Sequence, residues 1–493
     1  MKIGLLNRFV ALAIVGAVAV PTVSVASTTL TAAKACRAAI TLKGKTYANA
    51  RRRLLLACAD RLLKCNLQIE VEGHTAGTCL SLATSACNTK LGSASDSSLN
   101  LARTRFHDKT VLACLAYPFA SIMSTTSGGL WYSNDTTCNG SADLPALITC
   151  LRDEIDLKVD EVVGRVKPRA GLLLDNIGLG SLYPNLPRPP ITDIVISLSP
   201  PNTDGGTLVL TPDPSTSPIP NGNAIRFTGD ATSLPCGGGM GNNGKITIDI
   251  STAANPCTDP NALEHTIKQP YGAGETAVFG PLDADQNICL HLKDPGGMGG
   301  GCDITQTSAV DYNPGGVTPP TTSSASLLAC QTRLHNKVKA FARYTATKLH
   351  GCSEKVVRCK LANEIDAVDP TSCLASATSS CSTIPAAIDT KLAAFKDPVK
   401  ITAIPRKCGL VPFADLQPFV GGLGFSNVAA GCSGTADLNA LMDCILGTPT
   451  TASSTQGTKC SVEHKVFIRD PRANDSLTSG GLNPGTQFPC VGP

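Results

Sequence analysis

The chain has 493 residues, of which 42% are hydrophobic and only 4% are aromatic, and its formal net charge is +4. This length predicts about three domains, and the small charge argues against a dedicated nucleic-acid binder, in which a strong basic stripe is expected. We therefore expect no nucleic-acid partner. The densest basic run is Arg51, Arg52 and Arg53, which we interpret as a solvated helix face.

The first 26 residues have the pattern of a secretory signal peptide. A positively charged start and an apolar run from Phe9 to Val20 precede the small residues Ser24 and Ala26, which suit cleavage after Ala26. An uncleaved anchor is the less favoured alternative, because the apolar run is shorter than the ~20 residues that a membrane-spanning helix needs. We predict export to the periplasm, cell surface or exterior, with no membrane span after cleavage.

Cysteine usage agrees with export. The chain has 22 cysteines, an even number, which in an exported protein predicts disulfides. It has no CxxC pair, no CxxCH haem motif and no cysteine and histidine cluster at zinc spacing. We therefore expect no cofactor.

The cysteines reveal an internal duplication. Eight of them, from Cys36 to Cys150, are separated by 22, 7, 14, 8, 27, 24 and 12 residues, and the same separations recur without a gap from Cys330 to Cys444. A repeated spacing of this length indicates two copies of one structural unit. We predict a helical, cysteine-rich repeat 1 at residues 27–178 and a repeat 2 at residues 328–446.

The spacing within each repeat predicts a stapled helical hairpin. Apolar residues and cysteines from Lys34 to Asn66 fall three, four or seven apart, on one helix face, and a second helix begins near Cys79. An antiparallel hairpin brings Cys65 opposite Cys79 and Cys58 opposite Cys87. The same geometry predicts Cys352–Cys381 and Cys359–Cys373 in repeat 2. By extension we expect five further pairs: Cys36–Cys114, Cys138–Cys150, Cys330–Cys408, Cys432–Cys444 and Cys460–Cys490.

The segment before the last cysteine is the best matched part of the two repeats. Ser141 and Thr435 are expected to cap a short helix there. The shared Asp143 and Asp437 then lie in the first turn, where a carboxylate favours the helix dipole. We interpret these aspartates as structural, and we predict no catalytic residue.

These motifs resemble a known kind of repeat. Both copies contain a helix that ends in cysteine, a Cys-Leu-x-x-Ala segment and a terminal Cys-x-Gly-x-Ala-Asp-Leu-x-x-Leu-x-x-Cys segment. The pattern is similar to cysteine-rich α-helical repeats of uncharacterised exported bacterial proteins, over residues 34–178 and 328–446. The resemblance implies export and a disulfide-linked helical domain, and it implies no activity.

The middle of the chain changes character. Residues 179–313 are rich in proline and glycine and contain short β-prone runs between turn signals. We predict a β-sandwich-like domain there, a linker at 314–327, and a linker with a disulfide-closed tail at 447–493. The expected fold class is α+β multidomain, with two disulfide-stapled helical domains flanking the β-sandwich-like domain.

One candidate metal site lies in this middle region. Asp283, Asp285, Asn287 and Asp294 supply oxygen atoms at spacings that a calcium loop uses. However, Ile288 occupies the position where an EF-hand loop needs glycine, so we favour a turn followed by a strand.

Two classes of function remain. The first is an exported structural or binding protein of unknown ligand, whose partner is protein, carbohydrate or the cell envelope. The alternative is a secreted hydrolase-type enzyme with its site in the central β-rich domain, although no GxSxG or HExxH motif is present. We favour the first, because the repeats share cysteines and packing residues, and a duplicated active site should retain more shared polar residues.

Overall fold

The computed structural model describes residues 25–72, 77–135, 137–188, 322–418, 421–449, 457–462 and 470–491, together with eight strands between residues 191 and 309. Helices account for 71% of the residues described. Among these residues no helix has both the length and the apolar character needed to cross a bilayer. The predicted signal peptide falls almost wholly outside the described part of the chain.

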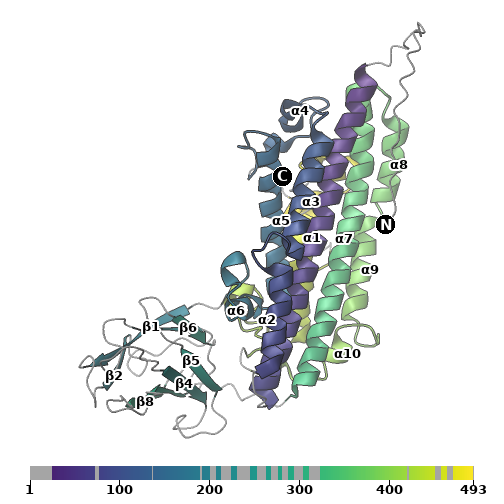
Figure 1. The fold of residues 1–493 in the computed structure, drawn as a ribbon. Coiled ribbons are helices and arrows are strands. Elements are labelled where there is room, and N and C mark those ends of the chain that lie inside the picture. Colours follow the sequence, from purple (N-terminus) through teal and green to yellow (C-terminus); the bar gives the residue numbers. More distant parts are fainter. Residues whose placement is uncertain are drawn as a thin grey trace, which may run out of the picture.

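Repeat 1 is built on one long helix (Figure 1). Its elements in chain order are α1 (Val25–Glu72), α2 (Gly77–Leu91), α3 (Ser98–Cys114), α4 (Phe119–Met123), η1 (Tyr132–Asn134), α5 (Leu144–Val166), α6 (Ala170–Asp175) and η2 (Gly180–Leu182). The predicted face of α1 is confirmed, since every member of it is buried: Cys36, Ile40, Tyr47, Leu54, Cys58, Leu62 and Cys65.

Repeat 2 has the same plan with more breaks. Its elements are α7 (Ser324–Asp366), α8 (Thr371–Cys381), α9 (Ile384–Lys396), α10 (Pro405–Cys408), α11 (Phe413–Leu416), η4 (Val428–Ala430) and α12 (Leu438–Leu446). Pro398 follows the end of α9 and Pro405 begins α10, because proline cannot continue a helix from within. The tail adds helical residues 457–462, α14 (Ala473–Ser479), α15 (Pro484–Gln487) and η6 (Pro489–Val491).

The long helices α1 and α7 lie side by side and run in opposite directions (Figure 1). Ser324, the first residue of α7, contacts Glu72, the last residue of α1. Near the other ends of the helices, Arg37 of α1 contacts Glu354 of α7. The two repeats therefore pack as an antiparallel pair, in the manner of a symmetric dimer on one chain.

The closing helix of each repeat has an aspartate cap. Asp143 and Asp437 are the N-cap residues of α5 and α12, and each carboxylate accepts a 2.8 Å bond from a backbone amide, that of Ala146 or Ala440. The expectation that Ser141 and Thr435 cap these helices is wrong, since their hydroxyls donate to the carbonyls of Cys138 and Cys432 instead. The structural interpretation of the aspartates agrees with this geometry.

The central segments form β1 (Ile191–Ser199), β2 (Thr207–Thr211), β3 (Ala224–Gly229), β4 (Lys245–Ser251), β5 (Leu263–Ile267), β6 (Thr276–Phe279), β7 (Asn287–Lys293) and β8 (Ile304–Ala309). Hydrogen bonding orders them β2-β1-β3-β6 and β5-β4-β7-β8. Pairing is antiparallel except between β1 and β3, where Ile191 lies opposite Ala224 in a parallel register.

The predicted β-sandwich-like domain is wrong as part of the fold class. The described structure is helical and disulfide-rich, and in this region side chains are described only on β1 and β2, where Ile194 and Leu210 are buried and Val195 and Val209 are exposed. Short alternating runs identify strands. They do not specify what packs on a sheet, because that depends on residues distant in the sequence.

Candidate functional site

Nine disulfides staple the helical part of the chain, and they join the four hairpin pairs predicted from the cysteine spacing and the five further pairs expected above. In both repeats the bonded cysteines are 78, 29, 14 and 12 residues apart, and Cys460–Cys490 closes the tail. No free cysteine occurs among the residues described. A thiol nucleophile is therefore absent from this part of the molecule.

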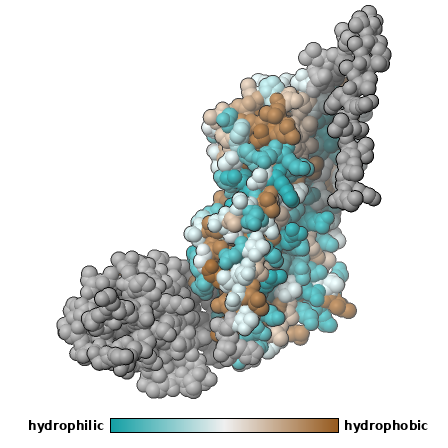
Figure 2. All heavy atoms as spheres, in the orientation of Figure 1, coloured by the Kyte–Doolittle hydropathy of each residue, from teal (hydrophilic) through white to brown (hydrophobic). Residues whose placement is uncertain are grey.

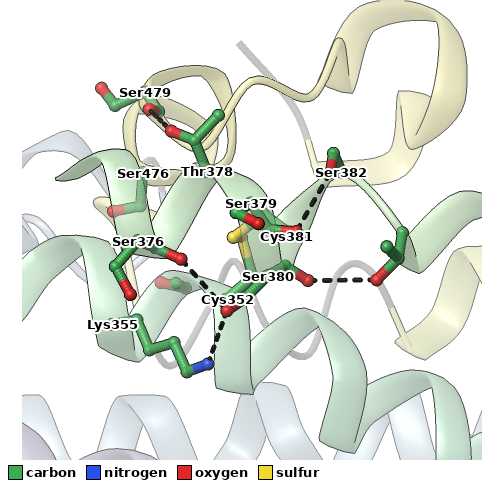
Figure 3. The surroundings of a disulfide bond; sticks show 12 residues. Cys352, Lys355, Ser376, Thr378, Ser379, Ser380, Cys381, Ser382, Ser476 and Ser479 are labelled. Carbon is green, nitrogen blue, oxygen red and sulfur yellow. Dashed lines mark hydrogen bonds between the residues drawn. A yellow bond between two sulfur atoms is a disulfide. The ribbon is translucent and has the colours of Figure 1, made fainter. Parts of the chain in front are cut away.

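The tail packs directly against one of these staples. Figure 3 shows the Cys352–Cys381 bond, above which Thr378 of α8 donates its hydroxyl to the carbonyl of Ser479. A β-carbon placed on Gly480 would lie 3.0 Å from Cys381 Sγ and 3.1 Å from Cys352 Sγ. Only glycine permits this approach, so the tail is held against repeat 2 by close packing on the disulfide.

A largely buried polar cluster lies inside repeat 1. Arg51 of α1 donates from Nε and Nη2 to the two carboxylate oxygens of Asp160 of α5, at 2.8 and 2.7 Å. The neighbouring Asp156 accepts a 2.5 Å bond from the Tyr47 hydroxyl and a 3.0 Å bond from Arg103. The interpretation of the arginine run as a solvated face is wrong for Arg51, whose guanidinium is fully enclosed.

The electrostatics of this cluster indicate a structural role. Burial raises the pKa of Tyr47, and the adjacent Asp156 raises it further. Burial also raises the pKa of Tyr183 to about 12, so both phenols stay protonated and donate. Each carboxylate already faces an arginine, and the side chains other than that of Arg103 are buried. The cluster joins α1, α3 and α5 and offers no position to a substrate.

A second set of ion pairs crosses between the repeats. Asp60 of α1 accepts from His335 Nδ1 of α7 at 2.8 Å and also contacts Lys167. Glu354 lies 294 residues after Asp60 and is therefore its counterpart in repeat 2. It contacts Arg37 of α1. The same position in each repeat thus supplies a carboxylate that contacts the other repeat. This follows from the antiparallel packing of the two equivalent helices.

The tail adds further contacts between the two repeats. Arg472 donates to both oxygens of Glu364 on α7, at 2.6 and 3.0 Å, and its guanidinium lies 4.9 Å from the centre of the Trp131 ring of repeat 1. Trp131 adopts a left-handed backbone conformation, with φ of 67°. Arg472 therefore joins both repeats to the tail.

Arg52 differs from its neighbour Arg51. It is buried and donates to Asn49 at 3.0 Å, and no carboxylate forms an ion pair with it in the described ranges. Burial, and then repulsion from Arg343 of repeat 2, lowers the pKa of Arg52 to about 10. The interpretation of the run as a solvated face is therefore wrong here too. Only Arg53 is exposed.

A groove in repeat 2 is the candidate binding site. It has a volume of about 510 Å³ and lies between the first turns of α7 and the segment that includes α10. Arg333, Lys337 and Lys407 line it, and none of these cations forms an ion pair with any carboxylate that the structure describes. Its other lining residues are neutral: Ala325, Leu328, Ala329, Thr332, Asn336 and Thr402.

Neighbouring contacts position two of the three cations. Arg333 Nη1 donates to the carbonyl of Ile401 at 3.3 Å. The Lys337 ammonium lies 5.0 Å from the centre of the Phe395 ring, and Lys391 approaches the same ring at 5.2 Å. Partial burial lowers the pKa of Lys337, and repulsion from Arg333 and Lys391 lowers it further. The groove is thus a region of uncompensated positive charge.

The sequence contains a signal for this groove that the analysis of motifs missed. From Ser324 to Ser353, the chain has five lysines and arginines and no aspartate or glutamate. The equivalent stretch of repeat 1, residues 30–59, has seven lysines and arginines and no aspartate or glutamate, yet its arginines at positions 37 and 51 are neutralised in the structure. Charge composition alone did not distinguish the two, because the partners come from distant elements.

The predicted calcium candidate gains no support. Asp283, Asp285 and Asp294 lie outside the described residues, and Asn287 is the first residue of β7 with no side chain described. Across the described ranges, no group of three or more histidine, cysteine, aspartate or glutamate side chains is arranged to hold a metal ion.

No family model, curated protein or solved structure matches this chain.

Proposed function

We propose that this protein is an exported binding scaffold, and that the basic groove of repeat 2 binds an anionic ligand. The observation that carries this proposal is the group of three cations, Arg333, Lys337 and Lys407, which line one groove without a carboxylate partner among the described residues. Clustered cations without a counter-charge repel one another and attract anions, so a bound anion would offset this repulsion.

The lining favours binding over catalysis. Thr332, Asn336 and Thr402 supply hydroxyl and amide groups that can donate to an anion. No histidine, carboxylate or thiol is part of the lining, and these are the side chains that most often serve as general acids, general bases and nucleophiles. The Cys330–Cys408 disulfide joins the two walls of the groove, which favours a preorganised arrangement of the cations.

The groove belongs to repeat 2 alone. At the equivalent positions, repeat 1 has Ala39 for Arg333 and Ala113 for Lys407, and it has Asp108 for Thr402. Two cations are thus missing and an acid is present. The proposal therefore predicts one anion site per chain.

Calorimetric titration of the full chain with tripolyphosphate, a soluble multivalent phosphate, tests the proposal. We expect one site whose affinity falls with added salt. The variant R333A/K407A, which introduces the residues of repeat 1, should bind at least about tenfold more weakly, because a hydrogen bond to a charged group contributes about 1.5–3 kcal/mol. The control R105A/K109A removes two exposed cations of repeat 1. Equal binding of tripolyphosphate by the wild type and R333A/K407A would refute the proposal that the groove binds the anion.

Export is the second part of the proposal. The nine disulfides suit an oxidising compartment, and residues 1–26 have the sequence of a signal peptide. Cell fractionation of the full chain, beside a chain that lacks residues 1–26, tests this part. We expect the full chain outside the cytoplasm with its thiols oxidised. Cytoplasmic retention with reduced thiols would contradict export.

A further inference from the structure

Three large apolar side chains beside the basic groove are exposed to an unusual degree. Val399 is 82% exposed, Ile401 is 77% exposed and Leu410 is 75% exposed, and no other large hydrophobic residue that the structure describes is as exposed. All three lie between the end of α9 and the start of α11. We call Val399, Ile401 and Leu410 the apolar tips.

The segment that bears the apolar tips is firmly anchored. Ala403 and Ile404 are completely buried between them, and Cys408 is bonded to Cys330 of α7. The exposure of the tips therefore does not come from a loosely attached loop. Their side chains point outward from a segment whose other side is part of the core.

The apolar tips and the cations of the groove belong to one surface. Thr402 and Lys407, from the same segment, line the groove, and Arg333 donates to the backbone of Ile401 itself. In Figure 2, hydrophobic and hydrophilic residues lie side by side at the lower end of the helical bundle, where Figure 1 places α10. The surface thus combines positive charge with protruding apolar groups.

The positions of the apolar tips and of two groove cations differ between the repeats. Its apolar tips Val399, Ile401 and Leu410 replace Arg105, His107 and Ala116 of repeat 1. The cations Arg333 and Lys407 replace alanines, as described above. At these five positions the apolar and basic residues are thus found together in repeat 2, whereas repeat 1 exposes Leu112 and Leu115 at other positions of the equivalent segment.

A soluble anion would need the cations but not the apolar tips. Exposed apolar groups beside a basic cluster fit the interface of a bilayer with anionic lipids, where cations meet the headgroup phosphates and apolar side chains enter the acyl boundary. We propose that repeat 2 docks on the surface of an anionic phospholipid bilayer through the apolar tips and the groove cations. This inference rests on the proposed function for its cations and adds the identity of the partner.

Vesicle co-sedimentation of the full chain tests the inference. The wild type should bind vesicles of phosphatidylcholine mixed with phosphatidylserine and should not bind vesicles of phosphatidylcholine alone. R333A/K407A should bind the anionic vesicles about 30-fold more weakly, which corresponds to about 1 kcal/mol for each cation near the surface.

The decisive variant is V399S/I401S/L410S, which keeps every cation. It should lose at least about tenfold in vesicle binding, because the apolar groups no longer enter the acyl region, and it should bind tripolyphosphate as the wild type does. The matched control L112S/L115S removes two exposed leucines of repeat 1, which are 70% and 68% exposed, and should leave both kinds of binding unchanged.

The outcomes separate the two proposals. Binding of tripolyphosphate without binding of anionic vesicles would overturn the docking inference and leave the groove proposal standing. Vesicle binding that does not change in V399S/I401S/L410S would also overturn the inference. Failure to bind tripolyphosphate would overturn the proposed function, and with it the role of the cations in docking. Circular dichroism of each variant checks that the helices are retained.

Discussion

Arg37 and Asp470 are 433 residues apart in the sequence, yet Arg37 Nη2 donates to Asp470 Oδ2 at 2.5 Å. Ser353 of repeat 2 donates its hydroxyl to the same carboxylate. One buried aspartate thus joins α1, α7 and the tail. Burial by itself raises the pKa of Asp470, but Arg37 and Ser353 outweigh this and hold the pKa below its usual value.

Replacement of this carboxylate should weaken the whole assembly. We expect Asp470→Asn to lower the free energy of unfolding by about 3 kcal/mol, because it leaves Arg37 buried with Glu354 as its remaining partner. Urea unfolding followed by circular dichroism measures the change. A loss below about 0.5 kcal/mol would show that Asp470 does not hold the tail in place.

The buried Asp470 carboxylate also predicts how the free energy of unfolding depends on pH in acid. Since the pKa of Asp470 is lower in the folded state, its contribution is present above the unfolded pKa of 3.8 and is lost as the pH falls through the folded value. Between neutral pH and about pH 5, this contribution should therefore be constant. In unfolding experiments below that range, the wild type should lose its advantage over Asp470→Asn. An advantage that persists at the lowest pH would contradict the assignment.

Two glycines should respond to alanine with opposite signs. Gly480→Ala places a β-carbon against the Cys352–Cys381 bond, whose sulfurs cannot easily shift, so we expect a loss of about 1–3 kcal/mol. Gly351 lies within α7, where a β-carbon would meet nothing within 4 Å. Gly351→Ala should stabilise the protein by about 0.5–1 kcal/mol. Thermal unfolding of both variants checks the pair, and stabilisation by Gly480→Ala would refute the close packing of the tail.

The adjacent residues Arg51 and Arg52 form a second matched pair. Arg51→Met leaves Asp160 buried without its bidentate partner and should cost about 3–5 kcal/mol. Arg52→Met removes a buried cation that no described carboxylate neutralises, and should be neutral or stabilise by about 1 kcal/mol. Denaturant unfolding of the two variants separates these outcomes. A large loss in Arg52→Met would reveal a counter-charge for that guanidinium.

Removal of equivalent disulfides from the two repeats should have different effects on proteolysis of the tail. Cys58–Cys87 and Cys352–Cys381 each join residues 29 positions apart, so removal of either should cost about 3–4 kcal/mol through the entropy of the unfolded chain. Only C352S/C381S also disturbs the surface on which Gly480 packs. Limited proteolysis should therefore cleave the tail sooner in this variant than in C58S/C87S. Equal rates of cleavage would contradict the contact.

Local patterns in the sequence were enough for some features. The cysteine spacing predicts the hairpin pairs such as Cys65–Cys79, because residues equidistant from a turn meet in an antiparallel hairpin. The buried face of α1 follows from helical periodicity. The segments Ile191–Leu198 and Lys245–Ile250 are recognisable as strands from their composition. Each of these inferences depends on residues close together in the chain.

The other features depend on contacts between residues that are distant in the sequence. Arg51, Arg52 and Arg53 have one chemistry, yet the first faces Asp160, the second faces Arg343 and the third faces solvent. The sequence determined the long helices of the repeats and the cysteine pairs of their hairpins. Only the tertiary structure decided which charges are neutralised and left the groove of repeat 2 basic, because a charge is compensated by whatever the fold brings near it and not by its neighbours in the chain.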